Sequence, residues 1–275
     1  IVPNLVPREH LVNAIALQSM LGTSSAVIGP ALLPLMISLG AIDGVFFFVG
    51  ASYAFTTLMF IQLKSQPTRT DSEPQSPWRD LVSGLSYIRM NRVIVALIMI
   101  GVLTGIFAGS LPTLLPVFAE RVLSGNVETY TDLLLSSGIG GMIGAMALAN
   151  FVRLRNSSSI QLIAGAGLGI GFMVLAGIEW MPVAIFIIAI IGIFSVCFGA
   201  INNTLLQSIL DDAFRGRVMS IHQLGWGASA IGSLFVGVLA ELVSVTFVFA
   251  VCGLITATTA TILSLYVSRH LNSKH

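Results

Sequence analysis

Charged residues are scarce in this chain: only 9% of its 275 residues are Asp, Glu, Lys or Arg, whereas 55% are hydrophobic. A soluble globular domain carries about 25% charged residues, so the shortage indicates a protein that lies in a lipid bilayer. The formal net charge of +1 excludes the strongly basic surface that nucleic-acid binding needs. We therefore expect no nucleic-acid partner.

Cysteine and histidine are also rare. Cys197 and Cys252 lie in apolar stretches, which argues against a disulfide framework or a cysteine-based zinc site. The four histidines are far apart in the sequence: His10, His222, His270 and His275. An intramembrane metalloprotease or lipid-modifying transferase needs a His, Glu or Asp cluster at membrane depth. We therefore expect no metal, no cofactor and no enzyme, although an intramembrane enzyme stays the less favoured alternative.

Long charge-free runs are what the chain has instead. A helix crosses the hydrocarbon core with about 20 apolar residues, and a run that crossed twice would expose backbone polar groups to lipid. Eight runs are long enough to cross once: 11–42, 44–63, 93–119, 133–152, 156–178, 180–210, 218–240 and 242–268. The sequence therefore predicts an all-α polytopic membrane protein with eight transmembrane helices.

Lys and Arg occur almost entirely in alternate loops. With eight spans, both termini and every second loop share one side, and the opposite side holds only Arg121. The shared side holds Arg8, Lys64, Arg69, Arg79, Arg89, Arg92, Arg153, Arg155, Arg215, Arg217, Arg269 and Lys274. Because loops rich in Lys and Arg stay in the cytoplasm, we predict that both termini are cytoplasmic.

One connection differs from the others. Residues 65–78 hold three prolines and many small polar residues, which is typical of a flexible linker. Apolar residues then recur at helical spacing, at Trp78, Leu81, Leu85 and Ile88. This pattern predicts an amphipathic helix over 78–91 on the membrane surface; the alternative is that the next span begins early. The linker separates two predicted spans from the six that follow.

A weak internal repeat relates the two ends of the chain. The charged segment PREH (7–10) precedes NAIAL (13–17), and DDAFRG (211–216) precedes RVMSI (217–221). An Ile-Gly pair follows inside each helix, at residues 28–29 and 231–232. Together with the six spans after a long central loop, the repeat suggests two homologous six-helix halves, the first of them shortened.

Stretches along the whole chain carry a likeness to a known family: LVPREHLVNAIAL (5–17), VIGPAL (27–32), LPVFAERVL (115–123), SSGIGGMIGAMALA (136–149), INNTLLQ (201–207) and RGRVMS (215–220). In these stretches the chain resembles the major facilitator superfamily, in the branch of bacterial exporters that includes the enterobactin (siderophore) exporter and macrolide efflux proteins. The resemblance implies a multi-pass protein of the bacterial inner membrane that acts on a small-molecule substrate.

The resemblance also implies an organisation. The family has twelve helices, of which this chain would supply helices 5 to 12. Residues 1–64 would hold the last two helices of the N-terminal half, 65–92 the central cytoplasmic loop with its amphipathic helix, and 93–275 the complete C-terminal half with inverted repeats. Because the first residue is Ile1, we expect a piece of a longer protein, with helices 1–4 as the missing packing partner.

Polar residues gather inside one predicted span. Ser195, Phe198 and Asn202 share one helical face, and Asn203 follows directly. In the resemblance this span is the cavity-lining helix 10, whose counterpart, helix 7, offers Phe107, Ser110 and Thr113. Amides beside aromatic rings suit a bulky, partly polar substrate. The other reading, left open, is that Asn202 and Asn203 form hydrogen bonds between helices.

Three residues near the start of the next span are further candidates. Trp226 is assigned to the substrate cavity. His222 could carry a proton, or it could be an interfacial histidine with its hydrogen bonds satisfied. Arg217, which matches the family motif, could latch one conformation, or it could belong to a solvated turn. Small residues at GxxxG spacing, Gly140 with Gly144 and Gly167 with Gly171, predict close helix packing.

The leading hypothesis is a secondary transporter, an efflux permease that exports small amphiphilic molecules such as siderophores or drugs by alternating access. No Asp, Glu, Lys or Arg lies in the middle of a predicted span, and such residues mark proton pathways. Proton coupling would therefore place its acid in helices 1–4. The alternative is a partial transporter fragment that does not transport by itself.

Overall fold

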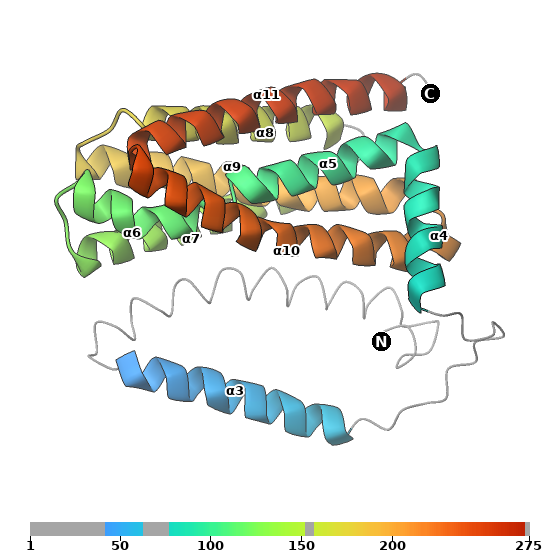
Figure 1. The fold of residues 1–275 in the computed structure, drawn as a ribbon, viewed down its shortest axis with the longest axis horizontal. Coiled ribbons are helices and arrows are strands. Elements are labelled where there is room, and N and C mark those ends of the chain that lie inside the picture. Colours follow the sequence, from blue (N-terminus) through green and yellow to red (C-terminus); the bar gives the residue numbers. More distant parts are fainter. Residues whose placement is uncertain (1–41, 63–76, 152–156, 273–275) are drawn as a thin grey trace. The chain divides into compact units, whose positions relative to one another are not determined.

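The computed structural model describes residues 42–62, 77–151 and 157–272, and every element in these ranges is an α-helix. The chain divides into two compact units, residues 1–74 and 75–275. The first unit contributes α3 (Ile42–Gln62). The second contributes α4 (Pro77–Met90), α5 (Arg92–Phe107), α6 (Leu111–Arg121), α7 (Val127–Phe151), α8 (Ser157–Leu175), α9 (Met181–Ile209), α10 (Asp212–Leu242) and α11 (Val245–Asn272) (Figure 1).

Six stretches of the described residues are long and apolar enough to cross a membrane: Arg92–Arg121, Val127–Leu148, Ser157–Leu175, Met181–Ile209, Phe214–Leu242 and Val245–His270. They correspond to the predicted runs from residue 93 onward. The run 44–63 falls on α3, whose apolar part, Phe46–Met59, is shorter than the six. The run 11–42 lies outside the described residues, apart from its last one. The protein is thus all-helical in its described part, with six candidate spans there.

Helix α3 carries apolar side chains around its whole circumference. Phe46, Phe47 and Phe48 are consecutive and are each more than half exposed within the structure, as are Tyr53 and Phe55. A helix that is apolar on all sides needs lipid or protein around it. The composition of α3 therefore suits a membrane helix.

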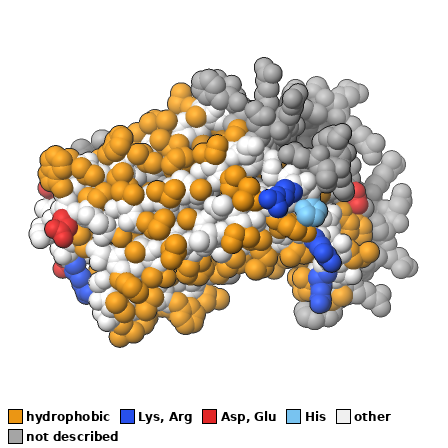
Figure 2. All heavy atoms as spheres, turned by 90° about the horizontal axis from the view of Figure 1, so that it is seen from above, with side chains coloured by type: hydrophobic (Ala, Val, Ile, Leu, Met, Phe, Trp, Pro, Cys, Tyr) orange, Lys and Arg blue, Asp and Glu red, His pale blue; other side chains and the backbone are white. Residues whose placement is uncertain are grey.

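The second unit has two chemically different ends. Successive spans of the bundle, with α5 and α6 taken as one, run in alternating directions (Figure 1). Arg89, Arg92, Arg217 and Arg269 therefore come to one end, which we call the basic end. Arg121 and Glu241 form an ion pair of 3.7 Å at the other end. On the face seen in Figure 2, hydrophobic side chains cover the middle of the molecule and charged ones lie toward its ends. This distribution suits a bundle surrounded by lipid.

Helix α4 crosses the basic end of the bundle nearly at right angles to the other helices (Figure 1). Tyr87 stacks on Phe214 of α10 with ring centroids 4.4 Å apart, and its hydroxyl donates to Asp211 Oδ2 at 2.9 Å. Arg217 donates to the Ser83 hydroxyl at 3.2 Å. The predicted amphipathic helix over 78–91 therefore exists, and one of its faces packs on the start of α10. Whether the other face rests on a membrane surface stays a prediction.

Asn91 makes the corner between α4 and α5. It is the N-cap of α5, and its Oδ1 accepts hydrogen bonds from the backbone N–H groups of Val93 (3.0 Å) and Ile94 (3.4 Å). The first N–H groups of a helix have no partner within the helix, so this side chain satisfies two of them.

Replacing Asn91 by alanine removes both cap bonds. We expect a loss of about 1 kcal/mol in the free energy of unfolding, measured by denaturant titration of the purified protein in detergent. Asn91→Asp keeps an acceptor oxygen at the same place and should be nearly neutral. An unchanged stability of Asn91→Ala would show that water caps this helix equally well.

The predicted span 93–119 is broken in the structure. Helix α5 ends at Phe107, and Ala108–Ser110 form a turn in which the N–H groups of Ala108 and Gly109 both donate to Thr104 O, at 2.8 and 3.1 Å. Pro112 stands in the first turn of α6. A proline has no N–H to donate and its ring clashes with the carbonyl four residues earlier, so Pro112 favours a new helix that begins at this position, although α6 itself continues through Pro116.

Glycines let several helices approach closely, as their spacing predicts. A Cβ atom at Gly140 of α7 would lie 1.9 Å from the carbonyl oxygen of Ala189 on α9, and one at Gly144 would lie 2.7 Å from Ile193 O. Gly169 of α8 and Gly253 of α11 meet in the same way, backbone against backbone. In lipid, where tails are as apolar as side chains, such backbone contact drives helix association.

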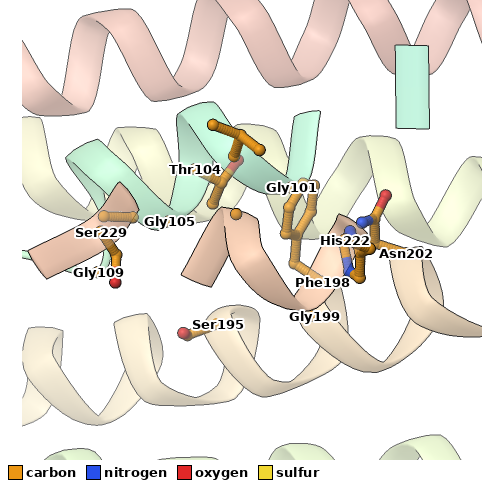
Figure 3. A pocket seen from close by; sticks show the side chains of 13 residues that line it. Gly101, Thr104, Gly105, Gly109, Ser195, Phe198, Gly199, Asn202, His222 and Ser229 are labelled. Atoms are coloured by element: carbon orange, nitrogen blue, oxygen red, sulfur yellow. The ribbon is translucent and has the colours of Figure 1, made fainter. Parts of the chain in front are cut away.

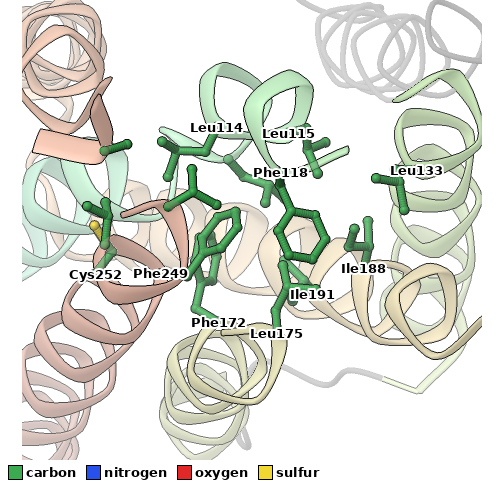
Figure 4. Close-up of a cluster of buried hydrophobic side chains, with 14 of the residues drawn as sticks. Leu114, Leu115, Phe118, Leu133, Phe172, Leu175, Ile188, Ile191, Phe249 and Cys252 are labelled. Atoms are coloured by element: carbon green, nitrogen blue, oxygen red, sulfur yellow. The ribbon is translucent and has the colours of Figure 1, made fainter. Parts of the chain in front are cut away.

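Two hydrophobic clusters fill the bundle. The first contains Phe118, Phe172 and Phe249, whose rings meet edge to face with centroids 5.4 and 5.8 Å apart (Figure 4). The second lies toward the basic end and contains Ile94, Leu97, Phe198, Leu206 and Val218. The pocket described below lies between these clusters.

Candidate functional site

A pocket of about 210 Å³ opens between α5, α9 and α10 (Figure 3). Three helices line it with small, apolar and uncharged polar residues, and with one histidine. They are Gly101, Val102, Thr104, Gly105, Ala108, Gly109, Ser195, Phe198, Gly199, Asn202, His222, Gly225 and Ser229.

The pocket lies midway along the spans. On α5 the second cluster ends at Ile100, the pocket residues follow, and the first cluster begins at Leu111 of α6. On α10 the pocket residues likewise lie between Val218 of the second cluster and Val236 of the first. The pocket therefore lies at the middle of the candidate spans.

Glycine leaves much of the pocket wall as bare backbone. Gly199 has no atom within 4 Å of the place where a Cβ would stand, and at Gly105 the nearest atom is Ser229 Cβ at 3.8 Å. At Gly101, in contrast, a Cβ would lie 2.8 Å from His222 Cε1 and 3.0 Å from Asn202 Nδ2. Among the described residues Gly199 thus faces open space and a Cβ at Gly105 would make an ordinary van der Waals contact with Ser229, whereas Gly101 lets His222 and Asn202 rest against α5.

The side chain of Asn202 is hydrogen-bonded to helix α8. The amide of Gln161, on α8, donates its Nε2 hydrogen to Asn202 Oδ1 at 2.8 Å, and both side chains are buried, with 0% and 3% of their surface exposed. This pair is a hydrogen bond between helices. Asn202 also lines the pocket, so a hydrogen bond between helices does not exclude a place in the pocket wall; its role toward a substrate stays a prediction.

His222 is 7% exposed, and its Nδ1 has no hydrogen-bond partner among the described residues. The ring of His222 rests against α5 at Gly101, and the interpretation of an interfacial histidine with satisfied hydrogen bonds stays a prediction. A role as a proton carrier stays a prediction. Thr104 Oγ1, on the opposite wall, is likewise buried without a partner in the described structure.

The pocket brings together four of the predicted residues: Ser195, Phe198, Asn202 and His222. Other predicted residues lie outside it. Phe107 packs against the first cluster, the buried Ser110 donates to Phe107 O at 2.6 Å, and Thr113 is exposed on α6. For Ser110 and Thr113 the turn at 108–110 is the physical reason, since the chain changes direction there and α6 packs on the first cluster. Their role toward a substrate stays a prediction.

The remaining predicted residues lie further away or outside the described side chains. Asn203 is exposed, and its Oδ1 accepts from Gln207 Nε2 at 3.0 Å, one turn along the same helix. Arg217 lies at the corner between α4 and α10, with its guanidinium 5.7 Å from the centre of the Phe214 ring. The side chain of Trp226 is outside the described structure. The gating role of Arg217 is therefore untested.

Sequence reasoning missed the α5 wall of the pocket. Gly101 and Gly105 are four residues apart and share one face of α5, and Gly109 follows at the same spacing in the turn after it. This spacing was visible in the sequence. Gln161 offered no comparable signal, because it is a single amide in an apolar run. Among the described residues no three His, Cys, Asp or Glu side chains come together in a way that could hold a metal ion.

Comparison with known proteins places these features in a family. Residues 1–274 match the family described as transmembrane secretion effector, a group of major facilitator transporters. The chain is 23% identical over its whole length to the staphyloferrin A transporter of Staphylococcus aureus, covering 68% of that protein. It is 21% identical to macrolide efflux protein A of Enterococcus faecalis, with 80% of the chain and 70% of the relative aligned.

A third relative is the multidrug efflux pump Tap of Mycolicibacterium fortuitum, 26% identical over 78% of the chain and 53% of its own length. The chain thus spans between about half and 70% of the length of these relatives. They are membrane transporters, which supports a non-enzyme reading. With its six candidate spans and its match over residues 1–274, the chain belongs to the major facilitator superfamily of membrane transporters.

Proposed function

We propose that this chain forms the larger part of an efflux permease that exports small amphiphilic molecules, siderophore-like or drug-like, by alternating access. The observation that carries the proposal is the pocket between α5, α9 and α10, which lies at mid-depth and is lined by both apolar and polar groups. Ligand sites combine these two kinds of lining. The relatives named for siderophore, macrolide and multidrug transport support the same class of cargo.

The size of the pocket supports an arrangement of two facing halves. Whole ligand sites measure about 300–1,000 Å³, and this pocket measures about 210 Å³. In our proposal residues 93–275 are the C-terminal half, 65–92 the central loop, and 1–64 the last two helices of the N-terminal half. Four further helices before them complete a twelve-helix protein and the second wall of the cavity.

The charges support one orientation. Arg89, Arg92, Arg217 and Arg269 lie at the basic end, and positively charged residues favour the cytoplasm. We place this end, together with both termini, on the cytoplasmic side of the bacterial inner membrane. Among the described residues that line the pocket there is no Asp or Glu, so the acid that couples export to protons belongs in this proposal to the first four helices.

Filling the pocket tests the proposal. Among the described residues no atom lies within 4 Å of a Cβ built at Gly199, so the side chain of Gly199→Phe starts in open space and extends into the pocket. We expect cells that express the complete twelve-helix protein to keep a radiolabelled uncharged amphiphile out, and cells with Gly199→Phe to accumulate it like cells without the protein.

Gly227→Phe is the matched control. Gly227 lies on α10, is exposed, does not line the pocket and also has no atom within 4 Å of a built Cβ. It should export normally at equal protein level in the membrane. Normal export by Gly199→Phe would show that this pocket is not on the transport route.

A further inference from the structure

Asn202 and His222 form one polar corner of the pocket. Both lie against Gly101, where a Cβ would stand 3.0 Å from Asn202 Nδ2 and 2.8 Å from His222 Cε1 (Figure 3). They come from different helices, α9 and α10, so only the folded bundle brings them together. What this corner offers to a ligand depends on which of its atoms are already hydrogen-bonded.

The side-chain oxygen of Asn202 already accepts a hydrogen bond. Gln161 Nε2 donates to it at 2.8 Å from the side away from the pocket, and Gln161 is fully buried. An asparagine amide has one acceptor oxygen and two N–H donors. With the oxygen turned toward α8, the N–H groups remain for the pocket. Asn202 therefore presents hydrogen-bond donors to a ligand.

The imidazole of His222 presents a donor as well. Its Nδ1 is buried and has no partner among the described residues. A neutral imidazole carries one proton, on either ring nitrogen, and a buried N–H without a partner is costly. The proton therefore sits on Nε2, the nitrogen that is not enclosed, and His222 adds a second donor beside Asn202.

The uncharged lining of the pocket also favours a ligand that accepts hydrogen bonds. Its lining, as far as the structure describes it, includes no Asp, Glu, Lys or Arg, so a cationic ligand would lose its hydration without gaining a carboxylate partner. A carbonyl or carboxylate oxygen, in contrast, accepts from Asn202 and His222. We propose that this corner selects substrates by an acceptor oxygen and discriminates against organic cations. The inference rests on the proposed function, because it names the chemistry of the same site.

A matched pair of probes tests the selection. Naphthylacetamide and naphthylethylamine share a fluorescent ring, and they end in an amide and in an ammonium group, respectively. We expect the full chain in lipid nanodiscs to bind the amide about tenfold more tightly, as one extra hydrogen bond at the favourable end of its range allows. Equal binding, or tighter binding of the amine, would overturn the inference.

Asn202→Asp should reverse the preference. An aspartate keeps an oxygen for Gln161 Nε2 but replaces the donors with a second acceptor oxygen. We expect the variant to bind the amine about tenfold more tightly than the amide. The matched control is Asn203→Asp: this neighbour is exposed, and its oxygen already accepts from Gln207. That variant should keep the original preference.

His222→Phe gives an independent measurement if Asn202→Asp does not fold. It removes the Nε2 donor while keeping an aromatic ring of similar size, and the preference for the amide should fall severalfold. An unchanged preference in either folded variant contradicts the donor site. A pocket that binds neither probe, together with normal export by Gly199→Phe, would instead contradict the proposed function.

Discussion

Gly140→Val is expected to leave little folded protein in the membrane. A Cβ at this position would stand 1.9 Å from Ala189 O and 2.7 Å from its carbonyl carbon. Since these are backbone atoms of α9, no side-chain rotation relieves the clash, and α7 must move away from α9. Overpacked cores lose about 1–3 kcal/mol and sometimes more. We expect at least the upper end of that range, measured as unfolding free energy by denaturant titration in detergent.

The control for this prediction is Gly227→Val. The same substitution is made in a helix of the same bundle, but no atom lies within 4 Å of the added Cβ and the position is exposed. We expect its stability to stay within about 0.5 kcal/mol of the original. Equal stability of the two variants would mean that the α7–α9 contact is looser than the structure has it.

Phe118→Ala is expected to lower the free energy of unfolding by about 3–5 kcal/mol. Phe118 is fully buried in the first cluster, edge to face with Phe249 at 5.4 Å, and Phe249 in turn packs on Phe172 (Figure 4). Helix association in lipid depends on close packing, so the lost contacts and the cavity left behind account for the cost. The unfolding midpoint in detergent would measure it.

Phe186→Ala is the matched control, because Phe186 is 64% exposed on α9. It contacts lipid in the proposed membrane setting, and lipid fills the space that the ring leaves. We expect a change below about 1 kcal/mol. If both phenylalanine variants lose the same stability, the aromatic cluster is not what holds α6, α8 and α11 together.

The two readings of Asn202 show how far sequence reasoning reaches. An amide inside an apolar run can bridge helices or face a cavity, and the residue type does not distinguish these roles. The structure joins them, since Gln161 holds the oxygen while the side chain lines the pocket. Asn203 has the same type and neighbours but points outward to Gln207. One residue along a helix is a rotation of about 100°, which decides the environment.

The broken span shows a different limit. Pro112 is visible in the sequence, and a proline interrupts a helix for reasons local to the chain. The sequence near Pro112 does not determine which residues the break moves out of the pocket. Ser110 is buried in the turn and Thr113 is exposed on α6, because the packing of α6 on the first cluster sets the new direction of the helix.

By itself the sequence determined the helices, the six spans of the second unit, the amphipathic α4 and the family, because hydrophobic length and charge act locally along the chain. Only the tertiary structure decided that Gln161, Asn202 and His222, from three different helices, meet beside a row of glycines on α5. That meeting depends on the rotation of each helix about its axis and on how closely the backbones approach. Packing between distant segments sets both, and no local pattern encodes them.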